Sequence, residues 1–143
     1  MKTDTNTVVT HMFELGRVIR RAVFERAPAA MPLVHLETLK FIRECHGVTM
    51  SEIARYLHVT PPSATDMIEK LVHEKYLSRQ VDPSDRRIVR IVISKKGTLA
   101  LERTLKHRFT AMRNVIRRLS PKEQADFVRI LSKITNHNNT RKS

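Results

Sequence analysis

The feature that most constrains the fold is a single break in an otherwise helical pattern. Residues 76–81 and 87–93 are the only strand-like runs in the chain, and the second is rich in β-branched residues. Between them lies a turn sequence, DPSDR, with one proline and two aspartates. A proline-containing turn between two such runs predicts an antiparallel hairpin with its charges at the tip. The aliphatic residues of the second run would anchor this hairpin to a helical body.

Two short helices are predicted directly before the hairpin. Thr49 and Glu52 have the spacing of a capping box, so a helix is expected to begin after Thr49. Thr60 followed by Pro61 predicts a second start, because a hydroxyl caps the helix and proline is tolerated at its first position. Only residues 58–60 separate the two helices, which indicates a helix-turn-helix. A helix-turn-helix followed by a two-stranded hairpin is a winged helix.

Long amphipathic helices flank this region. We expect the first over residues 7–27, a second that includes Leu36 and ends near Gly47 as its left-handed cap, a long helix over 95–119 capped by Ser94, and a last one opened by Ser120. The predicted fold class is mainly α with a small β-hairpin. It forms one domain over 1–143, with a winged helix-turn-helix at about 33–94 and dimerisation helices at about 7–27 and 95–136. Helices of this length exceed what one copy needs for its core, so a homodimer is expected.

The charge of the chain indicates a polyanionic partner. The sequence has 27 Lys and Arg against 14 Asp and Glu, a formal charge of +13. Nucleic acid is the first expectation and an acidic membrane surface the second. No apolar run approaches the roughly 20 residues that span a bilayer, and nothing resembles a signal peptide, so a cytoplasmic protein without a membrane partner is expected.

The sequence lacks the patterns of an enzyme. We find no nucleophile motif, no paired-carboxylate signature and no glycine-rich phosphate loop. Cys45 is the single cysteine, so it cannot form an internal disulfide, and a passive thiol is favoured over a redox sensor. The histidines and acids do not have metal-ligand spacing, so no metal and no cofactor are expected.

The exposed face predicted for residues 61–74 has the size and polarity to enter a major groove. Ser63 and Thr65 can donate to phosphates or bases. Asp66 can accept from a cytosine amine, and Lys70 can reach a phosphate or a guanine. In the hairpin, an arginine at the tip would gain from the negative potential of a narrow minor groove. Asp85 lies two residues before Arg87 and can hold its guanidinium by a charge-assisted bond.

Two stretches carry a family resemblance. DPSDRRIVRIVISKKG (82–97) and MSEIARYLHVTPPSATDMIEKLVHEKYLSR (50–79) resemble the wing and the helix-turn-helix of the MarR family of winged-helix transcriptional regulators, and the likeness runs from about residue 8 to 135. The resemblance implies that Arg87 is the groove-inserted arginine and Asp85 its orienting partner. Arg86 falls at a variable family position. Lys75 stands where the family usually has glycine, which implies a strained helix cap.

The residue types and the resemblance together predict these DNA-binding residues: Ser51, Arg55, Thr60, Pro62, Ser63, Thr65, Asp66, Lys70, Arg79, Asp85, Arg86, Arg87 and Arg90. The resemblance also implies a small phenolic or aromatic effector between the dimerisation helices and the winged domain, with Met12, Arg17, His35, Leu36 and Phe109 as candidate lining residues.

We therefore expect a sequence-specific regulator of transcription, a ligand-responsive repressor that binds a pseudo-palindromic operator of double-stranded DNA as a dimer. The alternative is a non-specific architectural nucleic-acid-binding protein. A charge of +13 alone would produce salt-dependent binding to any duplex.

Overall fold

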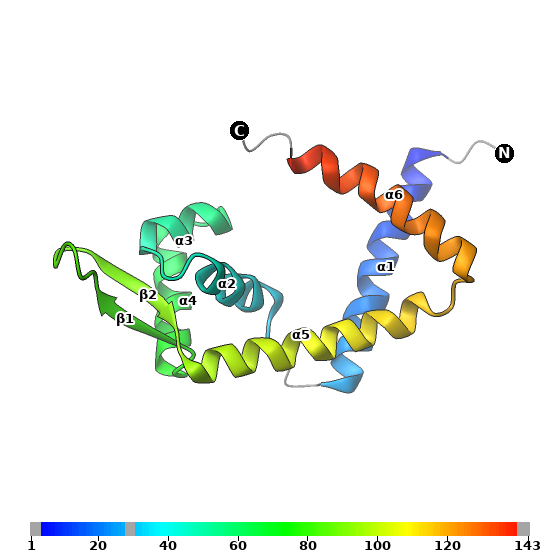
Figure 1. Cartoon of the computed structure of the whole chain (residues 1–143). Helices are drawn as coiled ribbons and strands as arrows, with labels where there is room; N and C mark the ends of the chain where they lie inside the picture. The colour runs from blue at the N-terminus through cyan, green and yellow to red at the C-terminus, as the bar shows by residue number, and fades with distance from the viewer. Residues whose placement is uncertain (1–3, 28–30, 140–143) are drawn as a thin grey trace. The chain divides into compact units, whose positions relative to one another are not determined.

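The computed structural model describes residues 4–27 and 31–139, which form helices joined by one hairpin (Figure 1). The elements in chain order are α1 (Thr5–Arg26), α2 (Leu33–Glu44), α3 (Met50–Leu57), α4 (Pro61–His73), β1 (Leu77–Val81), β2 (Val89–Ile93), α5 (Lys95–Ile116) and α6 (Pro121–Asn139). They belong to two compact units. Ala29–His107 is the winged-helix unit, and Met1–Pro28 with Arg108–Ser143 is the terminal-helix unit. The predicted fold class, mainly helical with a two-stranded winged-helix hairpin, is confirmed.

The winged-helix unit is built around one apolar core. The fully buried members come from every element of the unit except β1: Leu39, Ile42, Ile53, Ile68, Leu71, Ile91 and Leu101. Strands β1 and β2 pair antiparallel in a register that runs from Leu77 opposite Ile93 to Val81 opposite Val89. Val48, before α3, forms an isolated bridge with Ile91 and so ties the hairpin to the helix-turn-helix.

The predicted helix starts of the helix-turn-helix are confirmed. The backbone N–H of Thr49 donates to the Glu52 carboxylate at 2.7 Å, and the Thr49 hydroxyl accepts from the Glu52 N–H, which completes the capping box. Thr60 caps α4 by accepting from the N–H of Ser63, with Pro61 at the first helical position. Capping groups therefore set the angle-determining turn between α3 and α4 at residues 58–60, as predicted.

Three helices of this unit end at a residue in the left-handed region that is not glycine. The φ angles are 55° at His46, 53° at His58 and 65° at Lys75. After Lys75, the Tyr76 N–H donates to the Leu71 carbonyl at 2.9 Å, the bond that defines a Schellman motif. The strained cap expected at Lys75 is thus confirmed. The expectation that Gly47 would be the left-handed cap of α2 is corrected, because His46 takes that position and Gly47 follows it.

The end of α4 is also bonded to the start of α5. The Ser94 hydroxyl donates to the Lys75 carbonyl at 2.7 Å and accepts from the Gly97 N–H at 2.9 Å, which confirms Ser94 as the cap of α5. The Lys96 ammonium donates to the Glu74 carbonyl at 2.8 Å. A Cβ on Gly97 would lie 2.1 Å from the Tyr76 carbonyl oxygen, so only glycine allows this close approach.

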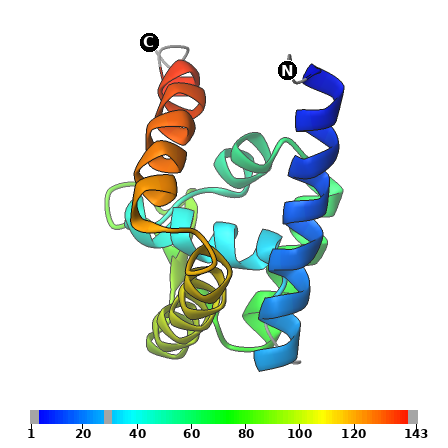
Figure 2. The same cartoon turned by 90° about the vertical axis from the view of Figure 1, so that its right-hand side faces the viewer.

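The terminal-helix unit combines α1, α6 and the last turns of α5. Both views show a sharp turn between α5 and α6 (Figures 1 and 2). The long helix ends at Ile116 rather than at residue 119, because the chain leaves helical geometry at Arg117 despite the apolar Leu119. The last helix extends to Asn139, three residues beyond the expected 136, and α1 covers Thr5–Arg26 against the expected 7–27. No helix in the described residues is long and apolar enough to cross a membrane.

Candidate nucleic-acid interface

The outer face of α4 is polar and exposed, as predicted. Ser63, Thr65, Asp66 and Lys70 are all exposed, while Ala64, Ile68 and Leu71 of the same helix are buried in the core. The Thr65 hydroxyl donates to the Pro61 carbonyl at 3.0 Å, which leaves its lone pairs available to accept. Asp66 and Lys70 make no hydrogen bond or ion pair in the described part of the chain. Their charged ends can therefore bind an external partner.

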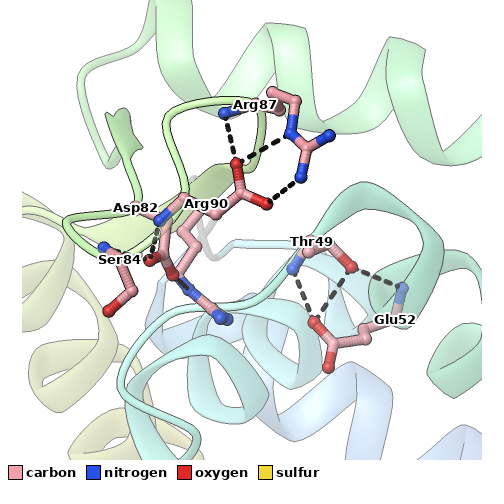
Figure 3. Close-up of polar contacts among 7 residues, drawn as sticks. Thr49, Glu52, Asp82, Ser84, Arg87 and Arg90 are labelled. Atoms are coloured by element: carbon pink, nitrogen blue, oxygen red, sulfur yellow. Dashed lines mark hydrogen bonds and ion pairs between the residues drawn. The ribbon is translucent and has the colours of Figure 1, made fainter.

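At the tip of the hairpin, Arg87 and Asp85 form a two-bond fork (Figure 3). The guanidinium donates from Nε to one carboxylate oxygen of Asp85 at 3.1 Å and from Nη2 to the other at 3.0 Å. The backbone N–H of Arg87 donates to Asp85 at 3.0 Å. These bonds lower the pKa of Asp85 and raise the pKa of Arg87, so both stay charged. The contact predicted from the sequence is confirmed.

The fork leaves Arg87 exposed while it fixes its direction. The Arg87 side chain is 90% exposed and that of Asp85 is 35% exposed. A surface ion pair of this kind contributes little to stability, since both groups remain solvated. Its effect is on conformation, because a bidentate pair holds the planar guanidinium in one orientation. The wing thus carries a cation that is oriented by the protein but not covered by it.

Asp82 and Arg90 hold the turn that carries this fork (Figure 3). Asp82 is 8% exposed, and one of its carboxylate oxygens accepts from Arg90 Nε. Its other oxygen accepts from the backbone N–H groups of Ser84 at 2.8 Å and Asp85 at 3.2 Å. The bond from Arg90, followed by that from Ser84, holds the pKa of Asp82 below its usual range. One carboxylate thereby joins strand β2 to the backbone of the turn.

The same arginine links the wing electrostatically to the start of α3. Bonds from Thr49 are the main cause of the lowered pKa of Glu52, and the positive charge of Arg90 lowers it further. Glu52 in turn raises the pKa of Arg90, after the larger effect of Asp82. The base of the wing and the first helix of the helix-turn-helix therefore share one chain of charges, drawn together in Figure 3.

The other predicted DNA contacts also lie in the winged-helix unit. Ser51 and Arg55 are exposed on α3, and Pro62 is exposed at the start of α4. Arg79 on β1 lies 3.9 Å from the Glu69 carboxylate of α4. Further along, Arg86 is exposed next to the fork. Thr60 uses its hydroxyl in the cap, and Arg90 uses its guanidinium within the wing, so their DNA contacts stay predictions.

Asp82 was not among the DNA-binding residues predicted from the sequence, although it positions them. The signal was present, because Asp-Pro-Ser-Asp is a sequence in which an aspartate side chain commonly accepts from the backbone two and three residues later. What the sequence could not show is the pairing of Asp82 with Arg90, which depends on the strand register.

The predicted effector residues fall in both units. Met12, Arg17 and Phe109 belong to the terminal-helix unit, while His35 and Leu36 belong to the winged-helix unit. Leu36 is 3% exposed within the apolar core. Burial, and then the positive charge of Lys70 (opposed by Glu74), lower the pKa of His35. Neither unit contains the predicted pocket by itself.

The terminal-helix unit contains two apolar hollows. One, of 390 Å³, is lined by Thr7, Val8, His11, Met12, Leu15 and Phe127. The other, of 220 Å³, is lined by apolar side chains of α1, α5 and α6, among them Leu15, Met112 and Leu131. Among the described residues, no group of three or more His, Cys, Asp or Glu could hold a metal ion.

A helix-turn-helix with a polar exposed second helix, followed by a hairpin that presents an oriented arginine, defines a winged-helix DNA-binding protein. Comparison with known proteins agrees. The family model described as "MarR family" matches residues 31–89, from just before α2 to the first residue of β2. The chain therefore belongs to the MarR family of winged-helix transcriptional regulators.

The curated relatives are annotated regulators from other bacteria. The chain is 26% identical over 96 residues to an uncharacterized helix-turn-helix regulator, YsmB of Bacillus subtilis, covering 67% of this chain and 66% of that one. It is 24% identical over 124 residues to the transcriptional repressor Rv2887 of Mycobacterium tuberculosis, covering 86% and 89%. These relatives are described as regulators of transcription and not as enzymes.

Solved structures show the same fold. MepR, a transcription regulator of a Staphylococcus aureus multidrug efflux pump, superposes with a TM-score of 0.74 at 19% identity, over 94% of this chain and 98% of that one. The complex of Rv2887 from M. tuberculosis with salicylic acid superposes with a TM-score of 0.68 at 22% identity, over 93% and 97%.

Proposed function

We propose that the protein regulates transcription by binding a specific DNA sequence, with α4 in the major groove and the wing in the adjacent minor groove. The observation that carries this proposal is the fork between Asp85 and Arg87. It supplies an exposed guanidinium whose direction is set before DNA is bound, so less conformational entropy is lost on binding. The polar face of α4 supplies donors and acceptors for base edges.

Variants at Arg87 test this proposal. Arg87→Ala removes the guanidinium, and we expect at least tenfold weaker binding to a DNA fragment from upstream of the protein's own gene. Fluorescence anisotropy at fixed salt measures the affinity. Arg87→Lys is the matched control for charge, since it keeps the positive charge but cannot form the fork or fit the groove in the same way. We expect Arg87→Lys to bind nearly as weakly as Arg87→Ala.

Two results would count against the wing as a reader of DNA. Unchanged affinity in Arg87→Ala, with an unchanged circular dichroism spectrum, would show that the wing does not contact DNA. Full recovery in Arg87→Lys would show that the wing contributes charge alone. In both cases the recognition helix would have to account for the specificity.

We also propose that the protein acts as a homodimer assembled through the terminal-helix unit. Large apolar side chains remain exposed there, including Phe13 at 77%, Val128 at 62% and Phe109 at 63%. Exposed apolar surface of this extent is unusual for a monomer and typical of an interface. Two copies would present two α4 helices and two wings to half-sites about one helical turn apart. A monomer at micromolar concentration in sedimentation velocity would contradict this.

A small aromatic effector is a further proposal. It is supported by the salicylic acid bound to the M. tuberculosis relative Rv2887. Titration of salicylate into the protein–DNA complex is expected to lower the anisotropy of labelled DNA, while an aliphatic acid of similar charge serves as the control. Release by both acids at the same concentration would indicate an ionic-strength effect. With DNA as its partner, the protein would act in the cytoplasm as a repressor, the role that relatives such as Rv2887 are named for.

A further inference from the structure

The positive charge of the chain is concentrated outside the winged-helix unit. The terminal-helix unit has 14 basic and 5 acidic residues, a formal charge of +9. The winged-helix unit has 13 basic and 9 acidic residues, a formal charge of +4, although every predicted DNA contact lies there. DNA recognition by α4 and the wing therefore does not account for most of the charge.

Much of the excess lies where α5 ends and α6 begins. Arg113, Arg117, Arg118 and Lys122, here termed the basic corner, are all exposed. Arg113 lies over the ring of Phe109, 5.0 Å from its centroid. None of the four forms an ion pair in the described residues. The sharp turn between the two helices (Figure 2) brings these cations onto one short stretch of ten residues, 113–122.

Local structure does not explain all of these cations. Arg117 and Arg118 follow the C-terminus of α5, where a positive charge is favoured by the helix dipole. Lys122, however, lies in the first turn of α6, where the dipole disfavours a positive charge. The nearby Glu123 is committed to the Ser120 cap at 2.7 Å. The corner thus carries more positive charge than its helices need.

A second copy of the chain would not neutralise this surface. Of the five acids in the terminal-helix unit, three are already bonded within their own copy, namely Glu25, Glu123 and Asp126. Only Asp4 and Glu14 remain, and a dimer doubles the cations as well as the acids. Uncompensated like charge destabilises a compact assembly unless a polyanion binds to it.

We propose that the basic corner binds the phosphate backbone of double-stranded DNA, as a sequence-independent contact separate from α4 and the wing. This inference rests on the proposed function, because DNA held by the winged-helix unit supplies phosphates at a high effective concentration. Arginine suits this partner, since its planar donors match two phosphate oxygens at once. The corner contributes affinity and salt dependence, and the winged-helix unit contributes sequence selectivity.

The test compares two triple variants of the full-length protein. One replaces the corner cations (Arg117→Gln, Arg118→Gln, Lys122→Gln). The matched control removes the same number of charges from exposed arginines of α1 (Arg20→Gln, Arg21→Gln, Arg26→Gln). The probe is a labelled duplex of random sequence, long enough to extend beyond one winged-helix site, in a series of potassium chloride concentrations. The slope of log affinity against log salt counts the phosphates that are contacted.

The corner variant is expected to lose up to about 2.7 from the magnitude of this slope, which is about 0.9 per contact. The α1 variant is expected to keep a slope close to that of the parent. Equal slope changes in both variants would show that only net charge matters, and an unchanged slope in the corner variant would show no contact. Either result overturns the proposal.

Vesicles of phosphatidylserine and phosphatidylcholine separate DNA from the other polyanion. If the corner variant loses vesicle binding while its DNA slope is unchanged, the corner serves an acidic membrane and the proposal is wrong. Arg87→Ala, measured in parallel, distinguishes this failure from a failure of the proposed function. A loss of sequence selectivity in Arg87→Ala, with an intact slope in the corner variant, leaves the winged-helix reader standing and removes only the corner.

Discussion

Lys75 offers a direct test of the backbone strain at the end of the recognition helix. Its φ of 65° lies in the left-handed region, where a residue with a Cβ costs about 1–2 kcal/mol. The bonds that hold it there, from Lys75 N–H to the Val72 carbonyl and from Tyr76 N–H to the Leu71 carbonyl, are both 2.9 Å long. They involve only the backbone, so Lys75→Gly would keep them while it relieves the strain.

The expected gain is about 1 kcal/mol of unfolding free energy. Relief of about 1–2 kcal/mol is partly offset by the greater unfolded-state freedom of glycine, about 0.5–1 kcal/mol. The Lys75 side chain is exposed and makes no hydrogen bond or ion pair in the described residues, so little else is lost. For a chain of this size, the gain corresponds to a rise in Tm of about 2–5 °C.

Urea unfolding followed by circular dichroism, at one fixed protein concentration, measures this gain. Lys75→Ala is the matched control, since it removes the same side chain but keeps the Cβ. We expect Lys75→Gly to be more stable than both Lys75→Ala and the parent. If the glycine and alanine variants unfold at the same urea concentration, the left-handed conformation carries no strain and the reasoning fails.

Three further perturbations have defined outcomes. Gly97→Ala places a Cβ 2.1 Å from the Tyr76 carbonyl oxygen and should cost about 1–3 kcal/mol in urea unfolding; a change below about 0.5 kcal/mol would refute the close approach. Asp82→Asn weakens the bond to Arg90, so hydrogen exchange across the wing turn should accelerate while Tm stays near that of the parent; unchanged exchange would contradict the role given to this carboxylate. His35 has a pKa lowered by burial, so protons bind the unfolded chain first, and stability should fall as the pH drops below about 6.5. His35→Gln should flatten this dependence; equal slopes would show that His35 does not cause it.

Local signals predicted the winged-helix unit well. The capping boxes at Thr49 and Ser120 and the cap at Thr60 marked helix starts to the residue, because a capping side chain and its backbone partner lie within three residues. The fork between Asp85 and Arg87 was predicted for the same reason, since its partners are two residues apart. Contacts between near neighbours in sequence depend little on the rest of the fold.

Contacts that depend on tertiary structure were beyond the sequence. Arg90 was predicted as a DNA contact, yet its guanidinium bonds to Asp82, eight residues earlier. This pairing follows from a turn geometry that brings the ends of two strands together, and residue spacing alone does not reveal it. The end of α5 was placed too late for a related reason. Leu119 continues the apolar periodicity, but the helix stops at Ile116 where the chain turns toward the α6 cap.

The distribution of charge also needed the structure. The total of +13 predicted a polyanionic partner, and it did not distinguish a specific regulator from an architectural protein. The division into units shows that the recognition surface is only moderately basic, so its oriented arginine and polar helix face, rather than bulk charge, must supply selectivity.

The central claim is that the protein reads a DNA sequence, and a specificity ratio tests it most directly. Labelled DNA from upstream of the protein's own gene is displaced by unlabelled competitor, either the same fragment or random duplex of equal length, at physiological salt. A specific regulator is expected to prefer its own fragment by roughly 10³-fold or more. Equal competition by the two duplexes, with a genome-wide binding footprint that shows no enriched sites, would contradict sequence recognition and identify a non-specific architectural protein instead.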